Sequence, residues 1–293
     1  MNIHYCGNMI LRYSLGVLIL GFAYTANAQS VSPTHVDSTK KRTVIINTAP
    51  VPVKMKKPKS LTKEFSVGGG LNTDGWSVLV TKGWIKGEDE KNSDKFHSVR
   101  IAQIEFSEHK HVKEIKGTNN RISQTANEKP KSFIYGKVNN FYSLKLGYGY
   151  RKMIAGKPES GTVSIHWMYA GGLSLGLLKP YYIDAYVLRD NPMRYERESI
   201  KYTEENREGF IRQENIVGSS GWATGLGETK VVPGIHAKTG LHFDFASQNR
   251  TKLAIEVGLA AELYTQKIEL MATQKAYPYL VNGYISLQFG KRK

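Results

Sequence analysis

The alternation of apolar and polar residues decides the fold, and it is plainest in residues 141–151, FYSLKLGYGYR. Every second residue from Tyr142 to Tyr150 is aromatic or aliphatic, and the residues between them are serine, lysine or glycine. Side chains of a strand point to opposite faces at period two, whereas a helix would scatter the two sets around its axis. The stretch therefore predicts a β-strand with one apolar and one polar face.

Further stretches alternate in the same way, at residues 163–169, 235–245, 253–263 and 279–289. Tyrosine (17) outnumbers phenylalanine (10) and there are 28 glycines, a composition that favours strands and turns. Hydrophobic residues make up 40% and charged residues 23% of the 293, which excludes both a disordered chain and a helical membrane bundle. The chain is therefore predicted to be all-β.

Three features indicate that the apolar face meets lipid. The alternating runs are roughly 11–15 residues long, which suffices for the 9–11 tilted residues that cross a bilayer. The polar face is rich in small and amide residues with opposed charges, which suits an enclosed lumen. Aromatic residues that suit the membrane interface lie towards the strand ends: Tyr142, Tyr150, Tyr169, Tyr264, Tyr279 and Phe289. A soluble barrel, which would bury the apolar face, is the alternative.

The predicted fold is a transmembrane antiparallel up-and-down β-barrel of about ten strands with long extracellular loops. Eight strands are the alternative, if residues 131–138 and one neighbour are irregular. Short periplasmic turns and long outer loops are the usual arrangement. The predicted strands are 64–71, 75–86, 96–107, 131–138, 140–153, 161–173, 177–188, 234–246, 251–265 and 277–290. The predicted periplasmic turns are 87–95, 139–140, 176–179 and 247–250, and the outer loops include 108–130, 189–233 and 266–276.

The N-terminus has the pattern of an export signal over residues 1–28, with cleavage expected after Ala28. Arg12 precedes a short apolar stretch, and Ala26-Asn27-Ala28 is a small-x-small cleavage pattern. The single cysteine, Cys6, lies in this segment, so a disulfide in the exported chain is excluded. Residues 29–60 are basic and proline-rich and are expected to form a disordered periplasmic tail. The barrel is expected to occupy residues 61–293.

Two segments resemble a group of uncharacterised outer-membrane β-barrel proteins of Bacteroidota-type bacteria. They are residues 135–149, with YGK followed by FYSLKLGYG, and residues 171–182, GGLSLGLLKPYY. The resemblance covers about residues 64–290 and implies the fold and an outer-membrane location, but no functional residues. Better-known outer-membrane barrels end in an aromatic residue, whereas here Phe289 is followed by Gly290-Lys291-Arg292-Lys293.

Charged residues of both signs occupy the polar faces of the predicted strands: Lys145, Arg151, Lys238, Lys252, Asp244, Glu256 and Glu262. Barrels of about eight strands have interiors just wide enough for side chains to fill. Buried charges need partners, so these residues are predicted to form a network that plugs the lumen. A narrow polar pore is the alternative.

No motif supports catalysis or metal binding. Residues 172–176, GLSLG, match the G-x-S-x-G pattern around Ser174, but no helical pattern follows them. The two glycines are explained by a corner of the barrel, where strands bend and crowd one another. His236 and His242 are about 20 Å apart along one strand, too far to share a metal ion. We expect no enzyme activity, no catalytic residue, no cofactor and no metal.

The segment 189–233 is the longest predicted loop, and Trp222 lies in a glycine-rich part of it. Trp222 is predicted to be a recognition tip or a lid over the barrel. The net charge of +16 would suit nucleic acid, but no recognition motif is present. Outer-membrane lipid and lipopolysaccharide are the expected partners of an exported chain, with other envelope proteins as further partners.

The expected function is a non-enzymatic outer-membrane barrel with a structural, binding or assembly role in the cell envelope. A narrow polar pore or transporter for small solutes is the first alternative. A soluble, exported lipid-binding barrel is the second.

Overall fold

The computed structural model describes residues 61–85, 98–119, 131–156, 162–190, 193–207, 210, 213–245 and 250–293. The predicted export signal and basic tail, residues 1–60, lie outside the described residues. No helix in the described part of the chain is long and apolar enough to cross a membrane.

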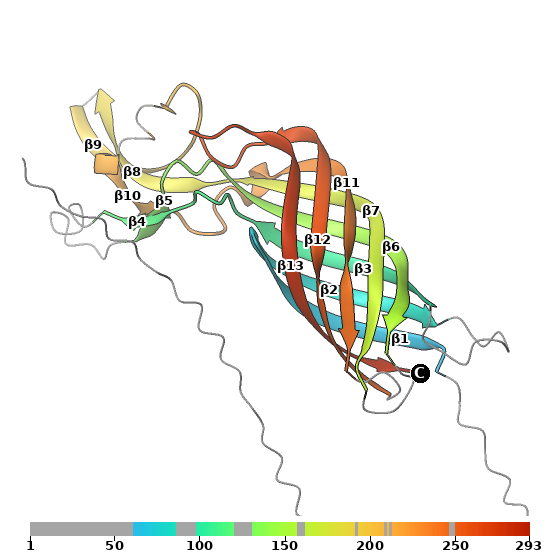
Figure 1. Cartoon of the computed structure of the whole chain (residues 1–293). Helices are drawn as coiled ribbons and strands as arrows, with labels where there is room; N and C mark the ends of the chain where they lie inside the picture. Colours follow the sequence, from blue (N-terminus) through green and yellow to red (C-terminus); the bar gives the residue numbers. More distant parts are fainter. Residues whose placement is uncertain are drawn as a thin grey trace, which may run out of the picture. The chain divides into compact units, whose positions relative to one another are not determined.

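Eight antiparallel strands close into a barrel (Figure 1). They are β1 (Lys63–Asn72), β2 (Gly75–Ile85), β3 (Ser98–His109), β6 (Asn139–Ala155), β7 (Ser164–Pro180), β11 (Lys230–Asp244), β12 (Thr251–Ile268) and β13 (Tyr277–Arg292). Each strand pairs with the barrel strands before and after it, and β13 closes the ring by pairing with β1. The all-β up-and-down barrel predicted from the alternation is therefore confirmed, with eight strands rather than ten.

The two surplus strands have separate explanations. Of residues 131–138, only β5 (Ser132–Ile134) is a strand, and it pairs with β4 (Lys116–Thr118) in a two-stranded sheet of its own. The predicted strand at 177–188 is divided between the end of β7 and β8 (Tyr182–Asp190). The turn predicted at 176–179 is thus wrong, because β7 continues through it and pairs with both β6 and β11.

Gly176 explains why this stretch suggested a turn. It faces the barrel interior, and a Cβ at this position would lie 2.7 Å from the Phe141 ring and 2.9 Å from the Tyr264 ring. The glycine is therefore required by packing within a continuous strand rather than by a change of chain direction.

The connections between barrel strands lie at two opposite ends of the barrel, and the two longest share one end. At the terminal end, where Lys63 N donates a hydrogen bond to Lys293 O, the connections are 86–97, 156–163 and 245–250. At the loop end they are 73–74, 110–138, 181–229 and 269–276. The predicted long loops therefore share one end. Residues 139–140 begin β6 at that same end, so the periplasmic corner predicted there is wrong.

The apolar rows face outward and the polar rows face inward. On the outer face Leu146 is 50% exposed and Val281 is 68% exposed, whereas the inward residues Lys145 and Asn282 are each 3% exposed. A soluble barrel would have the opposite arrangement. One predicted interface aromatic is misplaced: Tyr264 has the same strand parity as Glu262 and lies inside the barrel.

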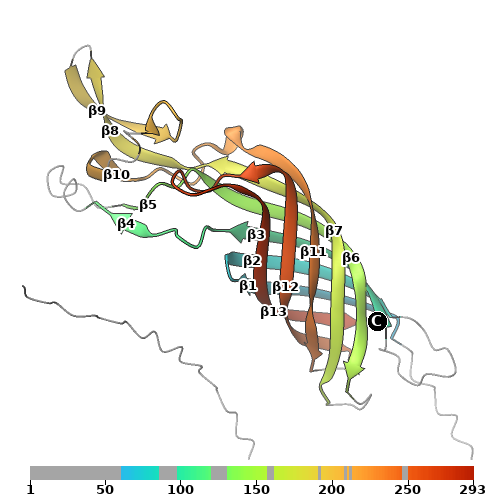
Figure 2. The same cartoon turned by 45° about the horizontal axis from the view of Figure 1, so that its top comes forward.

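The connection 181–229 contains its own structure, which the sequence pattern did not indicate. β8, β9 (Met193–Lys201) and β10 (Ile216–Ser219) form a three-stranded sheet in the order β10-β8-β9 (Figure 2). The short 3-10 helices η1 (Gln213–Asn215) and η2 (Leu226–Glu228) flank β10 in the chain. A small apolar core beneath this sheet contains Phe133, Ile183, Phe210 and Ile216.

Candidate functional site

The seven residues predicted to form the lumen network all lie inside the barrel. Each is 7% exposed or less: Lys145, Arg151, Lys238, Asp244, Lys252, Glu256 and Glu262. They come from β6, β11 and β12, where period two directs every second side chain inward. The charges of these side chains are too costly to bury without partners, so their contacts decide what the lumen can do.

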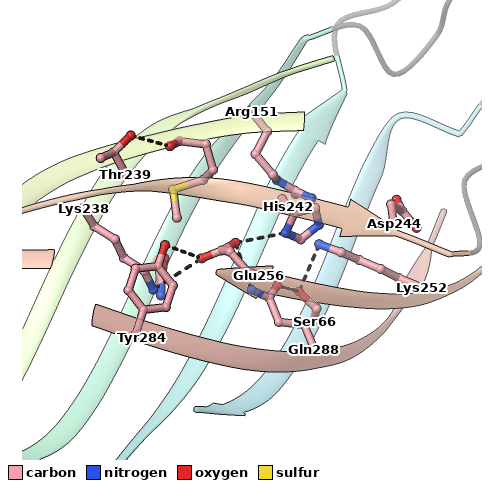
Figure 3. Close-up of polar contacts among 12 residues, drawn as sticks. Ser66, Arg151, Lys238, Thr239, His242, Asp244, Lys252, Glu256, Tyr284 and Gln288 are labelled. Carbon is pink, nitrogen blue, oxygen red and sulfur yellow. Dashed lines mark hydrogen bonds and ion pairs between the residues drawn. The ribbon is translucent and has the colours of Figure 1, made fainter. Parts of the chain in front are cut away.

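Glu256 is the centre of the middle cluster (Figure 3). His242 Nδ1 lies 2.9 Å from Glu256 Oε2, and Gln288 Nε2 donates to the same oxygen at 3.2 Å. The Tyr284 hydroxyl donates to Glu256 Oε1 at 3.1 Å, and Lys238 Nζ lies 3.4 Å from that atom. Both carboxylate oxygens are therefore engaged by groups from the two neighbouring strands, β11 and β13.

A second cluster lies nearer the loop end and is built around Lys145. Its Nζ lies 2.9 Å from Glu105 Oε1 and 2.8 Å from Glu262 Oε1. Glu262 also accepts a hydrogen bond from the Tyr264 hydroxyl at 2.5 Å. Lys238 Nζ lies 3.1 Å from Glu105 Oε2, which joins this cluster to the middle one.

The loop-end cluster continues to the rim through His109. His109 Nε2 lies 3.3 Å from Glu262 Oε1, and its Nδ1 lies 2.7 Å from Asp74 Oδ2 in the β1–β2 turn. A chain of polar contacts thus runs from the rim of the barrel to its middle.

A third cluster closes the terminal end. Arg292 pairs with Asp244, and Arg151 pairs with Glu64. Lys252 Nζ lies 3.1 Å from Glu64 Oε1 and Arg292 Nε lies 3.5 Å from Glu64 Oε2, so this carboxylate has three cationic partners. Three members of the network were missed in the sequence: Glu64, Glu105 and Arg292. Period two from Gln288 through Gly290 to Arg292 was the available signal for the last of them.

The charges of the lumen balance. Among the described barrel-strand residues that face inward, the lysines and arginines are Lys145, Arg151, Lys238, Lys252 and Arg292, and the acids are Glu64, Glu105, Asp244, Glu256 and Glu262. Each of them has an ion-pair partner of opposite sign within the set. The interior is therefore electrically neutral apart from its histidines.

Apolar side chains cover the network at the loop end. Phe141 and Tyr264 meet edge to face, with ring centroids 5.2 Å apart. The buried cluster that contains them also includes Leu178, Val232, Ile268, Leu270 and Met271. Leu270 and Met271 come from the β12–β13 loop, so this loop folds onto the mouth of the barrel.

The residues that suggested catalysis are not arranged for it. Residues 172–176 lie inside the 17-residue strand β7, without the strand–turn–helix context of a nucleophile elbow. Within the described residues, Ser174 Oγ forms no hydrogen bond with His166 or His236. The described residues contain no cluster of three metal-ligating side chains.

Trp222 lies against the outer wall near the loop end instead of over the bore. It forms one side of a cleft of about 610 Å³ between residues 222–229 and the ends of β2, β3, β6 and β7. Trp222 Nε1 donates to the Tyr142 hydroxyl at 3.4 Å, and Lys179 Nζ lies 5.8 Å from the centre of the Trp222 ring. We call this the rim cleft; its lining also includes Trp76, Phe106, Glu108, Leu177, Leu226 and Thr229.

Solved structures with a similar course of the chain are outer-membrane β-barrel proteins. Neisserial surface protein A is 8% identical, and the match covers 80% of this chain and 96% of that one with a TM-score of 0.32. Ail of Yersinia pestis is 9% identical, with 80% and 100% covered and a TM-score of 0.34. A major outer membrane protein from Thermus thermophilus is 8% identical, with 79% and 99% covered and a TM-score of 0.37. No protein-family model matches the chain, and no curated protein matches it.

Proposed function

We propose that this chain is a non-enzymatic outer-membrane β-barrel of a Gram-negative cell envelope, with a structural, binding or assembly role and a lumen that does not conduct. The inverted distribution of side chains is the observation that carries the proposal: exposed apolar rows surround a closed barrel whose charges are buried. Such a surface is stable in hydrocarbon, where only a closed barrel or a helix provides a hydrogen-bond partner for every backbone N–H and C=O group.

The filled lumen favours this role over a pore. Five cations and five acids neutralise one another inside, and Phe141 and its apolar neighbours cover them at the loop end. Separating a buried ion pair costs several kcal/mol, about 3–5 when one partner is removed. An ion crossing this interior would have to displace several such pairs, so we expect no steady current.

The outer-membrane location rests on the predicted export signal at residues 1–28 together with the barrel. The two longest connections, 110–138 and 181–229, share the loop end, which we assign to the cell exterior. The opposite end, which holds both ends of the barrel chain, then faces the periplasm. The resemblance to Bacteroidota-type barrel proteins agrees with this assignment and is part of the proposal. Outer-membrane lipid and lipopolysaccharide are the proposed partners, and other envelope proteins are further candidates.

Fractionation and conductance together test the proposal. The protein should appear in the outer-membrane fraction, require detergent for extraction and migrate faster on a denaturing gel before boiling than after. In planar bilayers the purified protein should give no discrete channel openings. Recovery from the periplasm without detergent would overturn the membrane assignment, and reproducible single-channel currents would instead support the pore.

A further inference from the structure

The rim cleft has an aromatic wall that belongs to the lipid-facing surface of the barrel. The Phe106 and Tyr142 rings stack with centroids 5.9 Å apart and planes 10° from parallel. Trp76 continues this wall, with its ring centroid 6.1 Å from that of Phe106. Because these residues stand at the loop ends of β2, β3 and β6, they lie where the outer leaflet meets water in the proposed orientation.

Two charged side chains line the cleft, and only one of them, Glu108, has a partner of opposite charge. Glu108 Oε2 accepts a hydrogen bond from Trp76 Nε1 at 2.6 Å and lies 3.2 Å from Lys110 Nζ. Lys179 is only 4% exposed, because residues 222–229 cover its position on the outer face of β7. Within the described part of the chain, no carboxylate lies within ion-pair distance of Lys179.

A lysine that is almost covered along its length and has no carboxylate beside it is a favourable site for an anion that a ligand supplies in the cleft. The Trp222 ring face offers only a weak cation–π contact. The cleft thus combines one cation that needs an anion with an apolar aromatic wall facing hydrocarbon. That combination matches a molecule with an acidic head and an apolar body.

We propose that the rim cleft binds a phosphate-bearing lipid of the outer leaflet, whose phosphate pairs with Lys179 and whose apolar part lies against Phe106 and Tyr142. This inference rests on the proposed function, since it requires the barrel to be in a membrane. Trp222 then covers the bound headgroup, so the tryptophan takes part in recognition of the lipid.

The test uses the purified full chain in dodecyl maltoside and native mass spectrometry to count bound lipid. Dioctanoyl phosphatidic acid, uncharged dioctanoylglycerol and inorganic phosphate are titrated separately. We expect phosphatidic acid to bind more tightly than either of the others. Lys179→Gln should weaken its binding about tenfold, because a charge-assisted hydrogen bond is lost.

Lys82→Gln is the matched control. Lys82 Nζ lies 5.3 Å from the centre of the Trp84 ring on the outer face of β2, but this pair lies toward the terminal end and outside the cleft. Binding should be unchanged in this variant. Trp222→Ala, which alters an exposed residue, provides a second test if Lys179→Gln does not fold, and it should also weaken binding of phosphatidic acid.

Three results would overturn the inference. The first is that wild type and Lys179→Gln bind phosphatidic acid equally tightly. The second is that Lys82→Gln weakens the binding of phosphatidic acid as much as Lys179→Gln does. The third is that inorganic phosphate binds as tightly as phosphatidic acid. Any of them would leave the barrel in the membrane fraction with an unchanged gel shift, so failure of the cleft can be told apart from failure of the proposed function.

Discussion

Arg292, one residue from the end of the chain, forms an ion pair inside the barrel with Asp244 of β11. The two residues lie on strands that are not neighbours, because β12 separates β11 from β13 in the ring. The register places Arg292 directly opposite Glu64 on β1, whose carboxylate lies 3.5 Å from Arg292 Nε. Arg292 therefore belongs to the barrel interior, and the chain forms a barrel strand up to this residue.

Removing this ion pair should destabilise the barrel. We expect Arg292→Ala to lower the free energy of unfolding by about 3–5 kcal/mol, because the substitution breaks a buried ion pair. Urea unfolding in lipid vesicles, followed by the gel shift, measures the change. Lys293→Ala, which alters an exposed neighbour, should change the free energy by less than about 0.5 kcal/mol. Equal effects of the two substitutions would contradict the pairing.

The packing of Gly176 makes a second prediction. Gly176→Val should destabilise the barrel by about 1–3 kcal/mol or more, since the new side chain collides with Phe141 and Tyr264. Gly69→Val on the outer face of β1 is the control, because a Cβ there meets only Ser77 O at 3.9 Å. The same unfolding assay compares them. If both glycines tolerate valine equally, the tight packing at the loop end is wrong.

The lipid-facing rows predict how charge is tolerated. Leu146 lies near the middle of β6 on the outer face, so Leu146→Arg should cost about 2–4 kcal/mol, as arginine does at the bilayer midplane. Val112→Arg, at a 91% exposed position in the β3–β4 connection, should be nearly neutral. Folding yield into vesicles and unfolding free energy both report the difference. A neutral Leu146→Arg would show that this face meets water.

The sheet formed by β8, β9 and β10 should depend on pH through Asp184. Partial burial tends to raise the pKa of this carboxyl, but hydrogen bonds from Ser199, Ser220 and Arg197 outweigh burial and lower the pKa below its usual value of 3.8. Near pH 4 and below, Asp184 therefore binds fewer protons in the folded sheet than in the unfolded segment. The stability of the sheet rises with pH up to about 4 and is constant above that pH.

Hydrogen exchange of residues 182–219 measures this dependence. Exchange should accelerate as the pH falls below about 4, after correction for the intrinsic rate, while the barrel strands keep their protection. Asp184→Asn should exchange faster than wild type at neutral pH and should lose most of the acid dependence. An unchanged acid dependence in this variant would assign the effect to other groups.

Much of the barrel could be predicted from the sequence, because period-two alternation is a local property of each strand. The outward rows of β6, β11, β12 and β13 follow from it directly. The strand count could not be settled in this way, since the glycine and leucine residues around Gly176 are compatible with a turn or with a packed strand. Only the neighbouring rings of Phe141 and Tyr264 decide between the two.

The candidate sites show the same division. Strand parity located Lys145 and Glu256 in the lumen, but their partners depend on the register between strands far apart in the chain. Glu105 illustrates the limit: it lies between Ile104 and Phe106 in an alternating run, yet its pairing with Lys145 and Lys238 requires the closed ring. The rim cleft depends on how residues 222–229 fold against the wall, and no local pattern specifies that contact.

The pairing of β1 with β13 sets the order of events when the protein is made. The first and last strands become neighbours only after the whole barrel sequence has been synthesised. Until then the outer edges of both strands offer unpaired backbone groups beside exposed apolar rows, a combination prone to aggregation. Formation of the β1–β13 pair is therefore the step that removes both exposed edges at once.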